Sequence, residues 1–394
     1  MTLSRQQPIA TMRCDRAWVE ISLAALAYNI RQLKHLLSSR TQLMAVVKAD
    51  AYGHGAVMVA ETVLQAGASW LGVATVPEGI ELREAGITAP ILILGATHTP
   101  EQIKAIAHWQ LQPTLCNFKQ ALVFAETLTA MQSEVLPVHL KLDTGMSRLG
   151  PPWQQAVEFV QLIARLPNLK IASIYSHLAT AESPDQTILR QQQRNFEQAI
   201  AQIKDAKLLF QNEQTQPALH LANSAATLTA PDLHYDMVRV GLAMYGLYPA
   251  WHLSPIDLKP VMQVKARITQ VKTIPAGTGV SYGHKFMSDR PIQLAVVGIG
   301  YADGVPRNLS NQMTVLLRGQ RVPQIGAITM DQLMLDVSAI ADVQEGEVVT
   351  LLGEDGTEKI SADDWATQLN TISWEILCSF KHRLPRVAIA EVRG

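Results

Sequence analysis

The first part of the chain alternates between short apolar runs and stretches with the periodicity of amphipathic helices. The apolar runs, which have the composition of buried strands, are Leu43–Val47, Leu71–Ala74, Ile91–Leu94, Gln112–Leu115, Val138–Leu142, Ile171–Ser176, Ala218–Ala222 and Met237–Val240. The helical patterns include Leu23–Leu37, Ala56–Ala66, Pro77–Ala85, Pro100–Gln110, Phe118–Met131, Gln154–Arg165 and Asp185–Lys204. Strands that alternate with helices over roughly 200 residues predict an α/β fold, a (β/α)8 TIM-type barrel.

Alternating strands and helices are also compatible with an open, doubly wound sheet. Such sheets carry a glycine-rich GxGxxG turn after the first strand, where it binds phosphate. Here the first strand is followed by Lys48-Ala49-Asp50, which favours the barrel.

From about residue 256 the pattern changes to alternating, β-branched segments separated by glycine-containing turns. These segments are Val261–Ile274, Ile292–Ile299, Met313–Leu317, Gln324–Met330 and Glu347–Leu352. Two helical patterns, Ala362–Leu369 and Trp374–Phe380, and a last strand at Val387–Val392 follow. The pattern predicts a mainly antiparallel β domain.

The length of 394 residues exceeds what one hydrophobic core usually supports, so we expect two domains. We assign residues 1–255 to the barrel and 256–394 to the β domain, with a linker at Pro249–Pro260. The strand-like segment Ala17–Ile21 is also compatible with pairing in the β domain, which would remove residues 1–20 from the barrel.

Composition narrows the class of protein. Hydrophobic residues make up 48% and charged residues 17% of the chain, which argues against disorder. Lys and Arg number 33 against 34 Asp and Glu, so we expect no nucleic acid or membrane partner. The three cysteines lack the spacing of metal ligands, and we expect no metal site. The N-terminus has no apolar core of a signal peptide, so a cytoplasmic protein is predicted.

Polar residues follow the carboxyl ends of several predicted strands, where (β/α)8 enzymes place their chemistry. Lys48 ends the first run, and a lysine in a partly desolvated pocket is a candidate Schiff-base nucleophile. A strand-end lysine that reaches to solvent is the simpler explanation for this residue alone. The other strand ends favour a site, because they carry Lys141 and Asp143, Ser176 and His177, Asn223 and Ser224, and Arg239 and Gly241.

The late strands carry the features of a phosphate site. Asn223-Ser224 precedes the helical stretch Ala225–Thr229, so the pair is either a simple N-cap or part of an anion cradle. Gly241 allows close approach of a ligand to the backbone. A lysine on the first strand beside a phosphate cradle on the last strands of a closed barrel suggests pyridoxal 5′-phosphate (PLP).

Together, these motifs resemble those of the alanine racemase family over essentially the whole chain. The motifs are Ala45–Gly55, His139–Gly150, Ala222–Ala226, Met237–Gly241, Val280–Gly283 and Gly300–Gly304. The resemblance implies a PLP-dependent isomerase that forms a homodimer, in which the β domain of one subunit completes the site of the other.

The resemblance also implies a two-base racemisation with one base on each face of the substrate. Lys48 would hold PLP and act on the D-alanine side, and Tyr282 of the partner subunit would act on the L-alanine side. Arg239 would face the pyridine nitrogen, and His177 would link Arg239 to Tyr282. The product D-alanine would supply peptidoglycan for the cell wall.

Further roles are implied by the same resemblance. Phosphate would be bound by Tyr52, Asn223, Ser224, Gly241 and Leu242. Arg148 would contact the phenolic oxygen of PLP and the substrate carboxylate, and Lys141 corresponds to a carbamylated lysine that positions Arg148. Met330 and Tyr301 would shape the substrate entrance, with Arg307 and Asp331 in the same network.

Three positions depart from the family pattern. Ser147 stands where glycine is frequent, Thr329 where many relatives have cysteine, and His382 where a tyrosine usually braces the phosphate. The alternatives are a broad-specificity or serine racemase, a basic amino-acid decarboxylase, and a non-catalytic PLP carrier protein. Arg239 argues against the decarboxylase, and the long β domain with Tyr282 and Tyr301 argues against the carrier.

Overall fold

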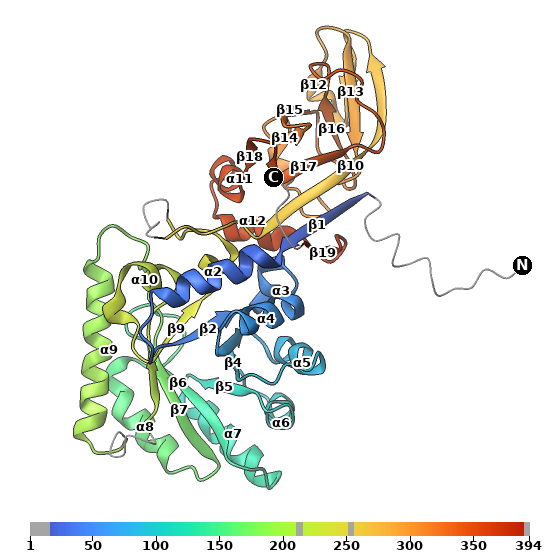
Figure 1. Ribbon diagram of the computed structural model, residues 1–394. Helices are drawn as coiled ribbons and strands as arrows, with labels where there is room; N and C mark the ends of the chain where they lie inside the picture. The colour runs from blue at the N-terminus through green and yellow to red at the C-terminus, as the bar shows by residue number, and fades with distance from the viewer. Residues whose placement is uncertain (1–15, 210–215, 251–255, 390–394) are drawn as a thin grey trace, which may run out of the picture. The chain divides into compact units, whose positions relative to one another are not determined.

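The computed structural model describes residues 16–209, 216–250 and 256–389 (Figure 1). Its contacts divide the chain into two compact units. The barrel unit contains Leu26–Ala51 and Ala56–Lys259, and the C-terminal unit contains the described residues up to Ala25, Tyr52–Gly55 and those from Pro260 onward. None of the helices in the described part of the chain is long and apolar enough to cross a membrane.

The barrel unit is built on eight parallel strands. They are β2 (Gln42–Val46), β3 (Trp70–Val73), β4 (Ile91–Ala96), β5 (Gln112–Leu115), β6 (Leu136–Lys141), β7 (Leu169–Tyr175), β8 (Ala218–His220) and β9 (Met237–Val240). They pair in the order β8-β7-β6-β5-β4-β3-β2-β9. The N–H of Asp236 donates to Leu219 and that of Arg239 to Ala222, so β8 and β9 also meet and the barrel closes.

Helices connect the strands and cover the outside of the barrel (Figure 1). They are α2 (Leu23–His35), α4 (Ala56–Gln65), α5 (Val76–Glu84), α6 (Pro100–His108), α7 (Phe118–Ala130), α8 (Ala156–Ala164), α9 (Thr187–Asp205) and the short α10 (Ser224–Thr229). Side-chain caps fix several helix starts, since Thr99 accepts the N–H of Gln102 and Asn117 that of Gln120. The predicted (β/α)8 barrel is confirmed.

The C-terminal unit contains one nine-stranded sheet. Its strands are β1 (Ala17–Ser22), β10 (Met262–Ile274), β13 (Ile292–Val297), β14 (Thr314–Leu317), β15 (Gln320–Ile325), β16 (Leu333–Asp336), β17 (Val348–Asp355), β18 (Glu358–Ile360) and β19 (Arg386–Ile389). The long β10 pairs with both β13 and β17, which closes the order β10-β13-β16-β15-β14-β17 on itself. A bulge between Ile268 and Gln270 lets one strand serve both neighbours.

The predicted mainly antiparallel β domain is confirmed, with corrections to its strands. The predicted strand Gln324–Met330 is wrong in its second half, because β15 ends at Ile325 and a loop precedes β16. β17 continues to Asp355 before the turn to β18. The segment Ala17–Ser22 pairs with β10 and β19 in this sheet. The part of the predicted last strand after Ile389 lies outside the described residues.

Directly after β2, α3 (Lys48–Gly53) is a left-handed turn. Ala49, Asp50, Ala51 and Tyr52 have φ of 54°, 51°, 53° and 55°. This conformation costs about 1–2 kcal/mol per non-glycine residue, so its neighbours must hold it. The N–H of Ala51 donates to Val47 (2.9 Å), and Asp50 Oδ1 accepts the N–H of Ala56 (2.7 Å).

Because the strain in this turn lies in the backbone, replacing exposed Ala49 with glycine should stabilise the protein. Glycine removes the left-handed penalty and adds unfolded-chain entropy, for a net gain on the order of 0.5–1 kcal/mol in the free energy of unfolding. Ala107→Gly in the right-handed α6 is the matched control and should destabilise by a similar amount. Chemical denaturation measures both, and an Ala49→Gly protein less stable than wild type would contradict the account.

Candidate active site

Lys48 lies at the carboxyl end of β2, half-buried, at the start of the left-handed turn. The peptide that follows it is clamped by Glu78 of α5. Glu78 Oε1 accepts the N–H of Ala49 (2.8 Å), while Oε2 accepts those of Ala74 (2.7 Å) and Thr75 (3.1 Å). One carboxylate therefore fixes the direction in which Lys48 leaves the strand.

The loop after β6 is folded around Asp143. Its Oδ1 accepts the backbone N–H groups of Gly145 (2.9 Å), Met146 (3.0 Å) and Ser147 (3.0 Å). Ser147 has φ of 55°, a left-handed conformation that glycine would adopt without strain. The turn presents the next residue, Arg148, as an exposed cation.

Lys141, the last residue of β6, is buried at 6% exposure. Gly150 packs over it with φ of 109°, and a Cβ there would lie 2.5 Å from the carbonyl oxygen of Lys141. Only glycine therefore allows the loop to return this close to the strand.

Arg239 of β9 is 4% exposed and is surrounded by hydrogen-bond acceptors. Its Nη2 donates to the carbonyl groups of Ser176 (2.7 Å) and Leu221 (3.1 Å), and lies 3.2 Å from His177 Nδ1. Its Nη1 lies 2.9 Å from His220 Nδ1. Because arginine can only donate, both imidazoles accept at Nδ1.

The electrostatics of this region are dominated by positive charge. The charged groups that act on His177 are Arg239, Lys141, Arg148 and Lys48, and these cations, after burial, lower the pKa of its imidazole. Burial, followed by Arg239 and Arg148, lowers the pKa of Lys141 to about 8. A cluster of cations of this kind is suited to an anionic ligand.

The predicted phosphate cradle lies between β8, α10 and β9. Ser224 Oγ accepts the backbone N–H groups of Gly241 (3.0 Å) and Ala243 (3.3 Å), which joins the ends of β8 and β9. Asn223 caps α10 by accepting the N–H of Ala226 (3.1 Å). Leu242 is buried and follows Gly241 in this connection.

Tyr52 belongs by its contacts to the C-terminal unit. Burial raises the pKa of its phenol to about 12, with a smaller contribution from Cys378. The carbonyl group of neighbouring Gly53 accepts a hydrogen bond from Arg386 Nε (2.9 Å). The phenol is therefore neutral at physiological pH.

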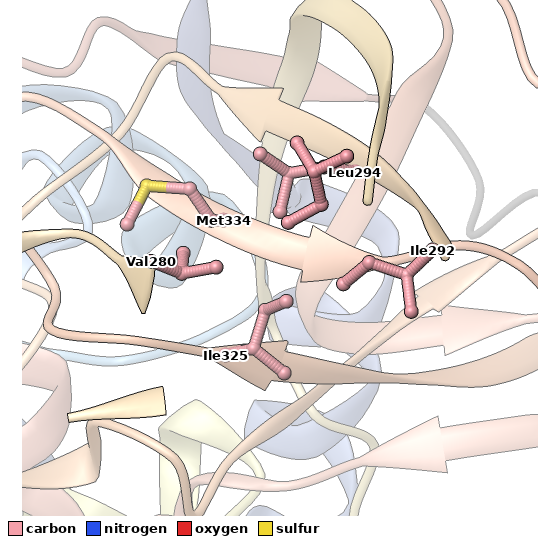
Figure 2. Packing of buried hydrophobic residues seen from close by; sticks show 6 residues of the cluster. Val280, Ile292, Leu294, Ile325 and Met334 are labelled. Atoms are coloured by element: carbon pink, nitrogen blue, oxygen red, sulfur yellow. The ribbon is translucent and has the colours of Figure 1, made fainter. Parts of the chain in front are cut away.

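Tyr282 is exposed at 71% on a tight turn of the C-terminal unit. Ser281 before it has φ of 63°, and its Oγ donates to the carbonyl group of Ala327 (2.7 Å). Val280 anchors the turn in a cluster of buried residues (Figure 2) that also contains Ile274, Ile292, Leu294, Ile325 and Met334. A groove of about 880 Å³ passes beside Tyr282.

Tyr301 and Met330 are exposed on two loops that are joined by backbone hydrogen bonds. The N–H of Tyr301 donates to Thr329 (3.0 Å) and that of Ala302 to Met330 (3.0 Å). A Cβ on Gly300 would lie 2.3 Å from the Thr329 carbonyl oxygen. The two loops are therefore joined by their backbones.

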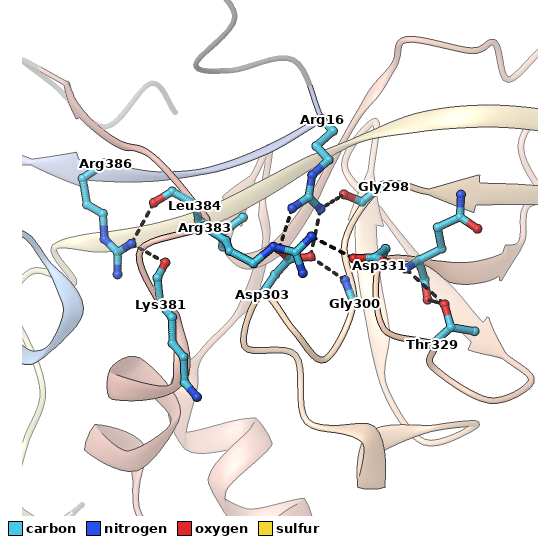
Figure 3. Close-up of polar contacts among 11 residues, drawn as sticks. Arg16, Gly298, Gly300, Asp303, Thr329, Asp331, Lys381, Arg383, Leu384 and Arg386 are labelled. Atoms are coloured by element: carbon cyan, nitrogen blue, oxygen red, sulfur yellow. Dashed lines mark hydrogen bonds and ion pairs between the residues drawn. The ribbon is translucent and has the colours of Figure 1, made fainter. Parts of the chain in front are cut away.

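An ion pair joins the half-buried Arg16 to the buried carboxylate of Asp303 (Figure 3). Arg16 donates from Nη1 and Nη2 to the two carboxylate oxygens of Asp303 (2.8 and 2.6 Å) and from Nη1 to the carbonyl group of Gly298 (2.8 Å). Asp303 is fully buried and also accepts the N–H of Gly300 (3.0 Å). Arg383 connects this carboxylate to Asp331, to which its Nη2 donates (2.8 Å).

Arg307, Asp331 and His382 are all exposed residues of the C-terminal unit. Of these, Asp331 has a described ion pair, with Arg383. The roles suggested for Arg307, Asp331 and the His382 position stay predictions.

Comparison with known proteins decides the family. The profile of the alanine racemase N-terminal domain matches residues 21–249, and that of the C-terminal domain matches residues 261–388. This chain belongs to the alanine racemase family. The predicted resemblance and the predicted class of enzyme, an amino-acid racemase, are confirmed.

Individual relatives cover almost the whole chain. An alanine racemase of Nostoc sp. is 72% identical over 95% of this chain and 96% of its own, and one of Synechocystis sp. is 64% identical over 95% and 99%. Among solved structures, the alanine racemase of Bacillus anthracis, described with bound L-Ala-P, has a TM-score of 0.89 at 34% identity, covering 97% of both chains.

Sequence reasoning missed several polar residues that face the barrel interior. They lie on β5, β7 and β8 and are Gln112, Thr114, Ser173, Tyr175 and His220. A signal was present, since residues two apart on a strand face the same side, and Gln112 with Thr114 and Ser173 with Tyr175 keep this spacing. The anchors Glu78, Arg16 and Asp303 carry no comparable pattern.

Since Asp303 anchors the loops of Tyr301 and Met330, Asp303→Asn should loosen them. The amide group would place a donor against Arg16, at a cost of about 1–3 kcal/mol in the free energy of unfolding. Hydrogen exchange at the Tyr301 and Ala302 amides should rise with it.

The control is Glu354→Gln, which removes an exposed ion pair with Lys359 and should cost less than about 1 kcal/mol. If exchange at Tyr301 is unchanged in a destabilised Asp303→Asn protein, the ion pair does not hold these loops.

Proposed function

We propose that this protein is a PLP-dependent alanine racemase that interconverts L-alanine and D-alanine. The observation that carries the proposal is the group of cations Lys48, Arg148 and Arg239 at one end of the barrel, in a chain of this family. PLP with an amino acid brings a phosphate, a phenolate and a carboxylate, and these anions fit the charge of the group.

The residues present fit the cofactor as follows. Lys48 would hold it covalently, and Ser224, Asn223, Gly241, Leu242 and Tyr52 would bind its phosphate. Arg148 would contact the phenolate and the substrate carboxylate. PLP supplies an electron sink that acidifies the Cα–H bond of the amino acid.

Racemisation needs a proton to leave one face of the α-carbon and another to arrive on the opposite face. Lys48 Nζ would take or return the proton on the D-alanine side. Tyr282 Oη of the partner subunit would do so on the L-alanine side. Its exposure of 71% on an anchored turn supports such a role.

Arg239 would face the ring nitrogen as a hydrogen-bond donor. Burial lowers the pKa of its guanidinium to about 10, so it stays charged at neutral pH and does not give up its proton. A pyridine ring whose nitrogen remains unprotonated is a weaker electron-withdrawing group, which would disfavour side reactions such as transamination. His177 would extend this contact toward Tyr282 of the partner subunit.

Lys141 is proposed to be carbamylated. Its lowered pKa, about 8, leaves an appreciable neutral fraction near pH 8. The neutral Nζ would attack carbon dioxide, form an N–C bond and lose a proton, which gives a negative carbamate. That carbamate would pair with Arg148 and hold it toward the substrate.

We further propose a homodimer in which residues 256–394 of each chain complete the partner's site. Tyr282, Tyr301 and Met330 are exposed at 71%, 42% and 53%, so a partner subunit would be able to reach all three. Tyr301 and Met330 would shape the substrate entrance. The buried Cys116 thiol favours a reducing compartment and so a cytoplasmic protein, whose D-alanine would supply peptidoglycan.

The direct test is D-alanine formation from L-alanine by the purified protein, with the visible spectrum recorded on the same sample. We expect a cofactor absorption band together with rapid turnover of alanine and slower turnover of serine. Faster turnover of serine would identify a serine racemase instead. A band without turnover of either amino acid would overturn the proposed function.

Mixing two inactive variants tests the shared site. Lys48→Ala and Tyr282→Phe should each be inactive, while a random mixture should recover about a quarter of wild-type activity, since half of the dimers carry one complete site.

The control mixes wild type with the double variant, in which every site of a mixed dimer lacks one base. Its activity should fall to about a quarter of wild type per chain by the same pairing. Absence of recovery, with subunit exchange verified by mass-tagged chains, would rule out a site shared between subunits.

A further inference from the structure

An unbroken series of hydrogen bonds crosses the interior of the barrel from Arg239. His220 Nδ1 lies 2.9 Å from Arg239 Nη1, and His220 Nε2 lies 2.8 Å from Ser173 Oγ. Ser173 Oγ lies 2.6 Å from His139 Nδ1, and His139 Nε2 lies 2.8 Å from Gln112 Oε1. The five residues come from β9, β8, β7, β6 and β5, so each link joins neighbouring strands.

These residues are enclosed by the barrel. Arg239, His220, Ser173 and His139 are 4%, 0%, 1% and 1% exposed. Gln112 alone is half-buried, where β5 begins and a groove opens. Burial of four polar side chains in a barrel interior is unfavourable unless each is hydrogen-bonded.

Aromatic rings hold the two imidazoles in place. The ring of Tyr175 stacks on that of His220 at 4.6 Å between centroids, with an angle of 7°. Trp70 packs its edge against His139 at 5.5 Å. Burial lowers the pKa of His139 to about 3 and, with Arg239 nearby, that of His220 well below its usual value. Both imidazoles are therefore neutral.

The direction of every bond follows from the two ends. Arg239 can only donate, so His220 accepts at Nδ1 and carries its proton on Nε2. At the other end the Gln112 Oε1 can only accept, so His139 carries its proton on Nε2 and accepts at Nδ1. Ser173 must then accept from His220 and donate to His139, which uses its single hydroxyl proton.

We propose that Gln112, His139, Ser173 and His220 form a directional hydrogen-bond chain that positions Arg239 as a fixed donor toward the cofactor ring. The chain presents only an acceptor to Arg239, so it orients the guanidinium without neutralising its charge. These four are positioning residues, and their functional consequence rests on the proposed racemase function.

The structural part can be tested without substrate. In protein with 15N-labelled histidine, two-bond 1H–15N correlations distinguish the tautomers, and His139→Gln and His220→Gln variants assign the signals. We expect both residues as neutral Nε2–H tautomers that do not titrate between about pH 6 and 9. Either residue in the Nδ1–H form, or titrating in this range, would overturn the chain.

Ser173→Ala tests the functional part, because it breaks the hydrogen-bond chain at its centre, between His139 and His220. We expect kcat to fall on the order of tenfold to a hundredfold with KM nearly unchanged, since Arg239 is mispositioned. The absorption band of the bound cofactor should shift, and His139 should lose its single tautomer. Thr127→Val is the control, since the Thr127 hydroxyl is also buried but donates only to Val123 within α7.

The outcomes separate this inference from the proposed function. If the wild-type protein does not racemise alanine, the proposed function is wrong, but the histidine tautomers still test the hydrogen-bond chain. Equal kcat and cofactor spectra in Ser173→Ala and Thr127→Val, in an active enzyme, would show that the chain does not position Arg239. A Ser173→Ala protein that fails to fold leaves the decision to the tautomers of the wild type.

Discussion

The buried guanidinium of Arg239 is the constraint on which the interior of the barrel depends. A cation at 4% exposure needs hydrogen-bond acceptors from the protein, because it has lost those of water. Here the acceptors are two carbonyl groups and two imidazoles. These acceptors are neutral, so they leave the charge of Arg239 uncompensated. Hydrogen-bonding side chains therefore occupy part of the barrel interior that apolar side chains usually fill.

The same uncompensated charge opposes folding and prepares the site for binding. Before the proposed carbamylation, Lys141 has a pKa of about 8, below its ordinary 10.5, so the unfolded chain binds more protons between these values. Stability therefore rises with pH through this window, and below about pH 8 the full cost of the buried charge is present. An anion bound among Lys48, Arg148 and Arg239 would remove much of this repulsion, so ligand binding and folding stability are coupled.

The sequence predicted the barrel because buried parallel strands are continuous apolar runs whose ends are marked by polar residues. Lys48, Lys141 and Arg239 all stood out in this way. In the C-terminal unit the strands are short and their turns decide the register, so the loop between β15 and β16 was mistaken for strand. The left-handed turn at Ala49–Tyr52 was not predictable from local preference, since tertiary hydrogen bonds from Glu78 and Ala56 hold alanines in a conformation that they normally avoid.

The loops that carry the exposed tyrosines Tyr282 and Tyr301 of the C-terminal unit are each fixed by hydrogen bonds of neighbouring residues. Tyr282 follows a serine with φ of 63° that is anchored to Ala327, and Tyr301 lies over the ion pair of Arg16 and Asp303. Strained backbone and a buried carboxylate both reduce stability unless neighbouring groups offset them. An exposed tyrosine side chain adds nothing to folding stability from such an arrangement. The fixed positions of these tyrosines are therefore better explained by binding of a second molecule to this surface.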